Sequence, residues 1–278
     1  MKLLAPAKLN LFLHITGRRD DGYHLLQTVF QFLDYADEIE LSAREDGEIK
    51  RLSGLEAVSA EDDLVVKAAS LLKQYTQTSY GVDISVNKKL PVGGGLGGGS
   101  SDAATVLVGL NQLWSCNLSI SQLADLGLSL GADIPVFVYG RAAWAEGIGE
   151  QLEPIDLPEN WFVVVHPKVF VSTAEIFSDK GLTRDCEPFK IARFLEGYGS
   201  NVFEPVVREK YQEVAKALNW LSSYSPARLT GSGSCIFAKF SNKIVAQSVL
   251  NELPSRWFGF IAKGLNKSPL YTSLEKEM

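Results

Sequence analysis

The stretch PVGGGLGGGSSDAATVLVGLNQLW, residues 91–114, indicates how this chain is built. Six of the seven residues from Gly93 to Gly99 are glycine. The apolar residues that follow recur every three or four positions, which predicts an amphipathic helix. We expect Ser100 or Ser101 to cap that helix and Asp102 to lie in its first turn. Glycines let backbone N–H groups approach a ligand closely, and a helix N-terminus adds partial positive charge. The combination favours a phosphate-binding loop.

Other interpretations of the glycine stretch fit the sequence less well. A flexible linker is disfavoured because a helical pattern begins immediately after it. A Walker-type loop requires G-x-x-x-x-G-K-[ST], and the chain contains no Gly-Lys pair. Gly93, Gly95 and Gly98 satisfy the dinucleotide pattern G-x-G-x-x-G, but the acidic residue expected about 20 positions later is missing from QLWSCNL. The H-R-D and D-F-G signatures of protein kinases are absent.

The sequence before the glycine stretch predicts a sheet and one helix. Residues 6–16 alternate as a half-buried strand, with Lys8, Asn10, Phe12 and His14 on one face. That mixture of a cation, an amide and an imidazole suits a cleft better than open solvent. Asp62 or Asp63 is expected to cap a helix. The further strands are predicted over residues 25–35, 37–43 and 82–88.

The sequence after the glycine stretch predicts a second α+β unit. A helix over residues 119–130 ends at Gly131, which places Asp133 at a helix junction. The segment EPIDLPEN, residues 153–160, is rich in proline and acid and predicts a domain boundary. Strands are expected over 161–167, 227–240 and 257–264, and helices over 172–177, 202–221 and 243–250.

Composition narrows the possible partners and the compartment. The chain has 278 residues and a net charge of −6, which disfavours binding to a nucleic acid. No apolar run approaches the roughly 20 residues that cross a bilayer, and the N-terminus lacks a signal-peptide core. We therefore expect a cytoplasmic protein with no membrane partner. Cys116, Cys186 and Cys235 are widely spaced without a nearby histidine, so neither a disulfide framework nor a zinc site is expected.

Five segments, in this order, resemble the GHMP kinases: PAKLNLFLHI, DGYHLLQTVFQ, PVGGGLGGGSSDAA, GADIPVF and RLTGSGSCIFA. Together they run from residue 5 to about residue 240. The wider superfamily has a shorter loop of the form P-x-x-x-G-L-G-S-S, whereas Gly98 and Gly99 expand it here. That expansion resembles the branch whose substrate is cytidine diphosphate methylerythritol, and it counts against mevalonate and homoserine kinases.

The resemblance implies a two-domain α+β fold and a chemistry. Residues 1–155 would form a ribosomal protein S5 domain 2-like, ATP-binding N-terminal domain, and residues 156–278 a ferredoxin-like, substrate-binding C-terminal domain. The implied activity is ATP-dependent phosphorylation of an alcohol of the cytidyl-linked substrate, in the non-mevalonate route to isoprenoids. ATP and Mg²⁺ would be the cofactors, and no dedicated metal cluster of side chains is expected.

The resemblance also assigns roles to residues. Lys8 and Asp133 would be catalytic, with Asp133 as general base beside apolar neighbours that limit its hydration. The residues assigned to ATP are Pro91, Val92, Gly93, Gly94, Gly95, Leu96, Gly97, Gly98, Gly99, Ser100 and Ser101. Those assigned to the substrate are Asn10, Tyr23, His24, Thr173, Phe177, Gly231, Ser232 and Gly233.

Plainer interpretations compete with these roles. A loop aspartate is more often a cap or turn residue than a base, a helical phenylalanine packs in cores, and paired glycines form tight turns. Two other functions stay open. Another GHMP kinase, acting on mevalonate, homoserine or a sugar, would lose the cytosine contacts. A nucleotide-binding regulator without turnover would not need Asp133.

Overall fold

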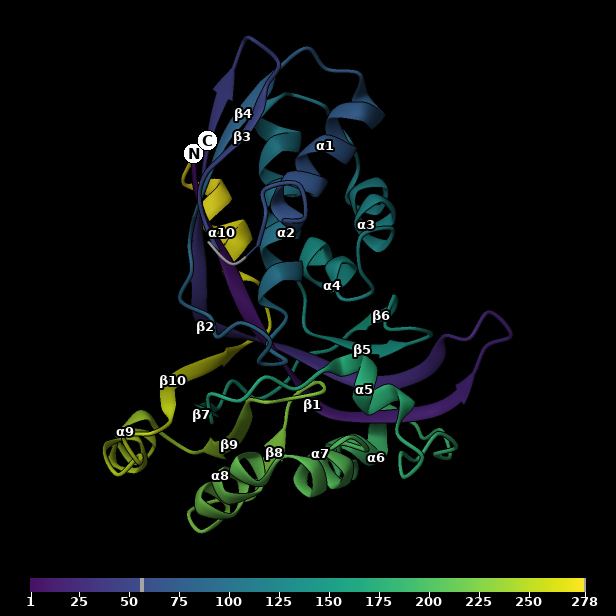
Figure 1. The fold of residues 1–278 in the computed structure, drawn as a ribbon, viewed down its shortest axis with the longest axis vertical. Coiled ribbons are helices and arrows are strands. Elements are labelled where there is room, and N and C mark those ends of the chain that lie inside the picture. Colours follow the sequence, from purple (N-terminus) through teal and green to yellow (C-terminus); the bar gives the residue numbers. More distant parts are fainter. Residues whose placement is uncertain (56–57, 278) are drawn as a thin grey trace.

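The computed structural model describes residues 1–55 and 58–277 and is organised around one long antiparallel hairpin (Figure 1). Strand β1 (Lys2–Arg18) pairs with β2 (His24–Arg44) along nearly its full length. Residues 25–35 and 37–43, predicted as two strands, form this single strand β2. The prediction was wrong because pairing with β1 continues across Ala36, which lies opposite Pro6.

The upper half of Figure 1 is a sheet covered on one face by helices. Strands β3 (Ile49–Ser53) and β4 (Gly81–Asn87) pair in parallel, and β4 then pairs antiparallel with β2. Asp63 caps α1 by accepting a hydrogen bond from the Val65 N–H at 3.1 Å, as one of the two predicted caps. The covering helices are α1 (Leu64–Thr76), α2 (Gly98–Leu113), α3 (Ile120–Leu128) and α4 (Ile134–Tyr139).

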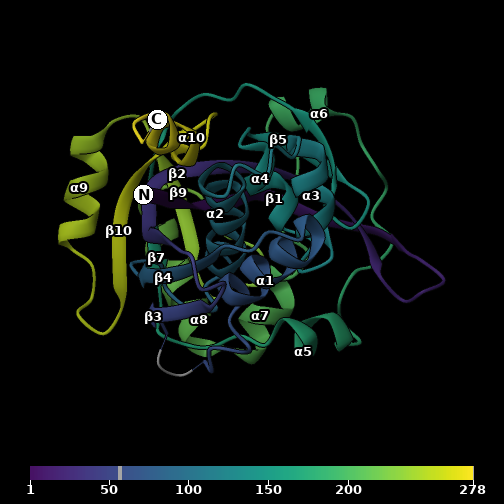
Figure 2. The same ribbon diagram turned by 90° about the horizontal axis from the view of Figure 1, so that it is seen from above.

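Helix α2 packs unusually close to the hairpin. A Cβ on Gly109 would lie 2.6 Å from a methyl of Leu3 and 2.7 Å from one of Leu41. The glycine therefore lets the helix axis approach the strands, and it fixes the position of the loop that precedes the helix. Figure 2, seen from above, shows α2 beside β1 and β2.

The lower half of Figure 1 is a second layered unit. Its strands are β7 (Trp161–His166), β8 (Ala227–Leu229), β9 (Ile236–Phe240) and β10 (Phe258–Leu265). Its helices are α5 (Thr173–Ser178), α6 (Ile191–Leu195), α7 (Glu204–Lys210), α8 (Gln212–Ser222) and α9 (Lys243–Asn251). Strands β5 (Ala143–Glu146) and β6 (Gln151–Pro154) extend the first sheet, because β5 pairs with β2 and β6 pairs with β5.

Two long elements predicted in this half are each divided in the structure. The helix expected over 202–221 is interrupted at Tyr211, whose φ of −121° and ψ of 88° lie outside the helical region. The strand expected over 227–240 becomes β8 and β9, which pair antiparallel around the segment 230–235. Apolar periodicity continued across Tyr211, so the sequence pattern did not reveal the first interruption. The second falls on the glycine turn TGSGS, residues 230–234, which the predicted strand had included.

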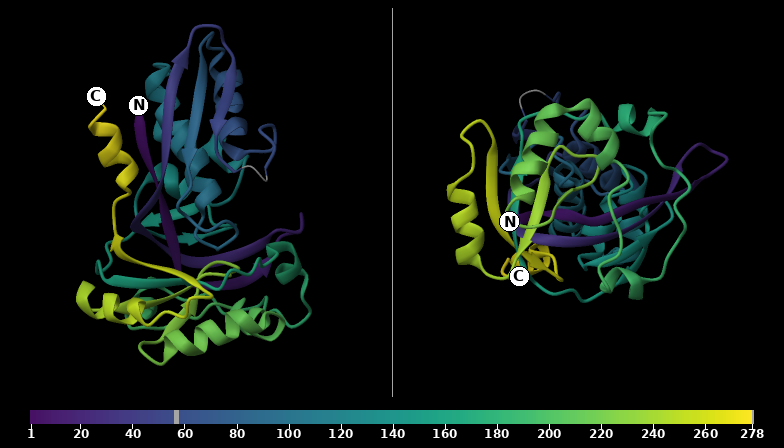
Figure 3. Two further views of the ribbon diagram at one scale, coloured as in Figure 1. Left: turned by 60° about the vertical axis from the view of Figure 1, so that its left-hand side comes forward. Right: turned by 90° about the horizontal axis from the view of Figure 1, so that it is seen from below.

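The two halves are continuous rather than separate. The sheet order β3-β4-β2-β10-β7-β9-β8 connects them through β10, with Gly264 opposite Leu33. The C-terminal helix α10 (Pro269–Glu275) returns to the start of the chain, and Ser273 Oγ accepts a hydrogen bond from the Leu4 N–H at 3.1 Å. Figure 3 shows both termini beside the upper sheet. The domain boundary near residue 155 stays a prediction.

Within the described residues, no helix is both long enough and apolar enough to cross a membrane.

Candidate active site

A buried lysine and a partly exposed aspartate form an ion pair at the centre of the molecule. Lys8 projects from β1 with a side chain that is only 3% exposed, and its Nζ lies 3.2 Å from Asp133 Oδ2. The same Nζ donates to Asn10 Oδ1 at 2.5 Å. Asn10 in turn donates from Nδ2 to Thr28 Oγ1 at 3.0 Å. This chain of contacts holds the ammonium in one position.

Asp133 occupies the N-cap position of α4, a helix that the sequence analysis missed. Its apolar neighbours in α4 are buried in the core. The carboxylate is 37% exposed, so the expected shielding by those neighbours was wrong. The apolar side chains of α4 point into the core, whereas Asp133, at the start of the helix, lines a cavity described below. The structure thus combines a buried ammonium with a carboxylate that a ligand can reach.

The glycine stretch packs tightly between the two halves. Gly95 and Gly97 both have a φ of 73°, and a Cβ on Gly97 would lie 2.8 Å from the Phe137 ring. The Leu96 carbonyl accepts a hydrogen bond from the Lys8 N–H at 2.9 Å. The loop therefore needs glycine both for its backbone angles and for space. It also ties the candidate phosphate site directly to the lysine.

Helix α2 begins earlier than predicted. Gly97 is its N-cap and Gly98 its first residue, so neither Ser100 nor Ser101 is the cap. Asp102 consequently lies beyond the first turn, contrary to expectation. Glycine at these positions leaves backbone N–H groups uncovered by side chains, which is an arrangement that suits an anion. Serine is usually a better helix cap than glycine. Here the prediction failed because the close packing of Phe137 leaves no room for a side chain at the cap position, Gly97.

The glycine loop forms one wall of a cavity of about 410 Å³. Every residue from Pro91 to Ser100 lines it, as do Lys88 and Asp102, whereas Ser101 is fully buried beneath the loop. Within the described part of the chain, the Ser101 hydroxyl and Asp102 Oδ1 are buried without a hydrogen-bond partner. Asp102 lines the cavity, so its free oxygen is available to a bound ligand.

A buried charge cluster supports the same cavity, and the sequence analysis missed it. Lys88 Nζ contacts Asp37 and lies 2.7 Å from Asp102 Oδ2. Burial raises the pKa of Asp102 to about 7, and the Lys88 ammonium opposes that rise. Burial would lower the pKa of Lys88, but the two carboxylates outweigh it and the net direction is upward. The only sequence signal was a lysine pair just before the glycine stretch.

A second cavity, of about 690 Å³, lies on the other side of Ser100. Ser100 lines both cavities, and Asp133 lines the second one. Four of the residues predicted to contact the substrate meet here: Tyr23, His24, Thr173 and Phe177. The structure therefore brings together residues from β2, α2, α4 and α5.

An aromatic pair lines the far part of this second cavity. The rings of His24 and Phe177 are stacked, with centroids 4.9 Å apart and planes 28° apart. Burial, followed by the charges of Arg18 and Arg184, lowers the pKa of His24. A neutral imidazole presents both a donor and an acceptor. Tyr23, by contrast, is 60% exposed on the loop between β1 and β2.

The turn at 231–233 contacts the site indirectly. Ser232 Oγ and Thr173 Oγ1 are 2.6 Å apart, while Gly231 lies against the backbone of Gly95. Gly231, Ser232 and Gly233 do not line either cavity. Asn10 also lines neither cavity and instead positions Lys8. These four residues contact other residues of the site, and their predicted contact with the substrate stays a prediction.

Comparison with known proteins links this geometry to one family. The family model described as "GHMP kinases N terminal domain" matches residues 63–141, and "GHMP kinases C terminal" matches residues 184–259. Proteins named 4-diphosphocytidyl-2-C-methyl-D-erythritol kinase are similar over nearly their full length. The one from Nitrosococcus oceani is 61% identical, covering 98% of this chain and 97% of the relative. The one from Alkalilimnicola ehrlichii is 55% identical, covering 98% and 94%.

Solved structures agree in fold. A crystal structure of 4-(cytidine 5'-diphospho)-2C-methyl-D-erythritol kinase is 31% identical, with a TM-score of 0.83, covering 95% of this chain and 99% of that one. A homoserine kinase from Cytophaga hutchinsonii has a TM-score of 0.70 at 16% identity, covering 97% and 96%. The second similarity concerns the fold alone.

Proposed function

The chain belongs to the GHMP kinases, and we propose that it transfers the γ-phosphoryl group of ATP to the 2-hydroxyl of 4-diphosphocytidyl-2-C-methyl-D-erythritol. The products would be ADP and the 2-phosphate, an intermediate of isoprenoid precursor biosynthesis. Identity of 61% to a relative of that name, over nearly the whole of both chains, supports this substrate over mevalonate, homoserine or a sugar.

One observation carries the proposal. The Lys8–Asp133 ion pair, with its 3.2 Å separation, lies between the two cavities that share Ser100: Lys8 packs against Gly97 of the glycine loop, and Asp133 lines the second cavity. A phosphoryl donor in the glycine-loop cavity and an alcohol in the second cavity would then react at this junction. Phosphoryl transfer needs positioning and charge stabilisation more than covalent help from the protein.

The two charged side chains would divide the work. Asp133 accepts the hydroxyl proton, since its carboxylate is reachable from the second cavity. The Lys8 ammonium stabilises negative charge that develops on the transferring group, and Asn10 keeps it aligned. Because Lys8 is buried, its field at the reacting atoms is weakly screened.

The glycine loop would hold the triphosphate, with Mg²⁺ as the expected companion of ATP. When bound near Ser100 and Asp102, Mg²⁺ would neutralise the negative charge of the triphosphate. Hard oxygen ligands are what this ion prefers, and the residues present fit it. Ser100 and Asp102 line the cavity, and Asp102 Oδ1 lacks a hydrogen-bond partner within residues 1–55 and 58–277.

The His24–Phe177 stack would recognise the cytosine. A base can stack on an aromatic ring at a gain of roughly 1–3 kcal/mol. A neutral imidazole can also form hydrogen bonds with the edge of the base. Tyr23 and Thr173 line the same cavity and would complete the contacts. An enzyme that uses these small, soluble substrates is proposed to work in the cytoplasm, without a nucleic-acid or membrane partner.

A comparison of four possible substrates tests the proposal. ADP release is followed in a coupled assay with the cytidyl-linked alcohol, mevalonate, homoserine and galactose offered separately. We expect turnover with the first compound and inhibition of that turnover by cytidine monophosphate. Preferential turnover of another alcohol would assign the chain to a different branch of the family. ATP binding without any turnover would instead support a regulator.

A further inference from the structure

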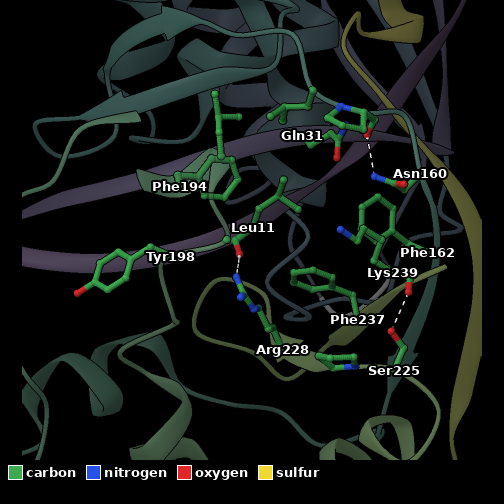
Figure 4. A pocket seen from close by; sticks show the side chains of 15 residues that line it. Leu11, Gln31, Asn160, Phe162, Phe194, Tyr198, Ser225, Arg228, Phe237 and Lys239 are labelled. Carbon is green, nitrogen blue, oxygen red and sulfur yellow. Dashed lines mark hydrogen bonds between the residues drawn. The ribbon is translucent and has the colours of Figure 1, made fainter. Parts of the chain in front are cut away.

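A third cavity lies outside the candidate active site and shares no lining residue with its two cavities. Its volume is about 420 Å³, within the range of small-molecule sites. Both halves of the chain contribute to it, through β1 and β2 on one side and β7 and β9 on the other (Figure 4). We call it the Arg228 cavity. We propose that it binds a small amphipathic anion, with an apolar body and one phosphate or carboxylate group.

The charge of the Arg228 cavity favours an anion. Arg228 and Lys239 line it, and no aspartate or glutamate does. Across residues 1–55 and 58–277, neither cation forms an ion pair with a carboxylate. Arg228 donates from Nη1 to the Leu11 carbonyl at 2.9 Å, which fixes the guanidinium and leaves its other N–H groups available. In a chain of net charge −6, two such cations around one cavity form a local positive region.

The walls of the Arg228 cavity favour an apolar body. The rings of Phe162 and Phe237 are almost fully buried beneath it, and Leu11, Leu157 and Phe194 complete an apolar lining (Figure 4). An inorganic anion alone would leave this surface without a partner. A ligand that carries both an apolar body and one charge uses the rings and the cations at once.

The segment 157–160, which forms one wall of the cavity, is held in place by amide side chains. Gln31, from β2, donates to the Pro158 carbonyl at 3.3 Å, and Asn160 donates to the same oxygen at 3.1 Å. Gln31 is buried although it lines the cavity. These hydrogen bonds therefore anchor the wall formed by residues 157–160 to the hairpin. Less binding free energy is lost to the ordering of side chains and loops when the wall of a site is already held in place.

Calorimetric titration with 1-naphthyl phosphate tests the proposal on the full chain. The matched probes are 1-naphthol, which lacks the charge, and inorganic phosphate, which lacks the body. Decyl phosphate and 1-naphthoate then separate an aliphatic from an aromatic body and a phosphate from a carboxylate. Thermal unfolding gives a second readout, since a ligand of the folded state raises the Tm.

Three variants locate the site. We expect Lys239→Gln to weaken binding of 1-naphthyl phosphate by about tenfold or more, the range expected for a charge-assisted hydrogen bond. Arg228→Gln should weaken it at least as much. Lys239 is exposed and forms no ion pair within residues 1–55 and 58–277, so we expect its variant to keep the fold even if Arg228→Gln does not. Lys216→Gln removes the same charge from the outer helix α8 and should leave the Kd unchanged.

Several results would overturn the proposal. Equal affinity for 1-naphthol would remove the role of charge, and equal affinity for inorganic phosphate would remove the role of the apolar walls. A Kd that does not respond to Lys239→Gln would place the ligand elsewhere, for example at the glycine loop. Because binding is measured without turnover, these outcomes are independent of the kinase reaction.

Discussion

Replacing Asp133 by asparagine should separate catalysis from stability more clearly than any other change in this chain. The substitution keeps the size of the side chain and removes its negative charge. Lys8 Nζ would lose a carboxylate 3.2 Å away but keep Asn10 Oδ1 at 2.5 Å. The buried ammonium therefore retains one hydrogen-bond acceptor, and the site should keep its shape.

The magnitude follows from the position of the pair. Two unit charges 3.2 Å apart interact by about 5 kcal/mol at an effective dielectric constant of ~20. Asp133 is 37% exposed, so solvent screens the pair and its net effect on unfolding should be about 1 kcal/mol or less. Loss of general-base help should cut kcat about 10²–10⁴-fold. That loss corresponds to roughly 3–5 kcal/mol of transition-state free energy.

The assay combines initial rates of ADP release with thermal unfolding and calorimetric ATP binding. Asp133→Asn should lower kcat strongly while the Tm and the Kd for ATP change little. Asp156→Asn provides the matched control, because Asp156 forms an exposed pair with Arg141 at 3.0 Å, remote from either site cavity. A near-normal kcat in Asp133→Asn would refute the base role. A large drop in Tm would show that the ion pair is chiefly structural.

Three further changes probe the loop, the aromatic pair and the buried acid. Gly97→Ala would place a Cβ 2.8 Å from Phe137 at a φ of 73°, so we expect about 1–2 kcal/mol of destabilisation in chemical unfolding and a weaker Kd for ATP. Phe177→Leu should raise KM for the cytidyl substrate about 5–100-fold through lost stacking, and an unchanged KM would exclude that role. Asp102 has a pKa raised to about 7, so its contribution to stability falls as pH rises from about 4 through 7. The Tm of Asp102→Asn should therefore rise relative to that of the parent as the pH increases across this window. The two Tm values are measured at successive pH values, and a constant difference between them would contradict the raised pKa of Asp102.

The local signals in the sequence were good guides where short-range physics decides the structure. Asp63, one of the two residues predicted as its cap, caps α1 through its side chain, and the helix predicted over 119–130 is α3, Ile120–Leu128. The glycine stretch adopts positive φ at Gly93, Gly95 and Gly97. Chain-local hydrogen bonds and backbone angles depend on neighbouring residues, so they can be inferred from neighbours.

The signals failed where distant contacts override local preference. The strand β2 continues through Ala36 because β1 pairs with it, and helix α2 begins at Gly98 because Lys8 and Phe137 leave no room for a side chain at Gly97. The packing of the turn 231–233 on the glycine loop is likewise a long-range contact that the sequence pattern did not indicate. Propensity was outweighed by packing in each case.

The sequence by itself determined that this chain is an α+β GHMP kinase, because five ordered motifs specify backbone shapes and residue types that few other sites require. Only the tertiary structure decided how those motifs act together. It places Lys8 beside Asp133 across 125 positions of the chain, joins two cavities at Ser100 and buries Lys88 between two carboxylates. It also assembles the Arg228 cavity from both halves. Distances between residues far apart in the chain are set by sheet pairing and core packing, and a linear pattern does not contain them.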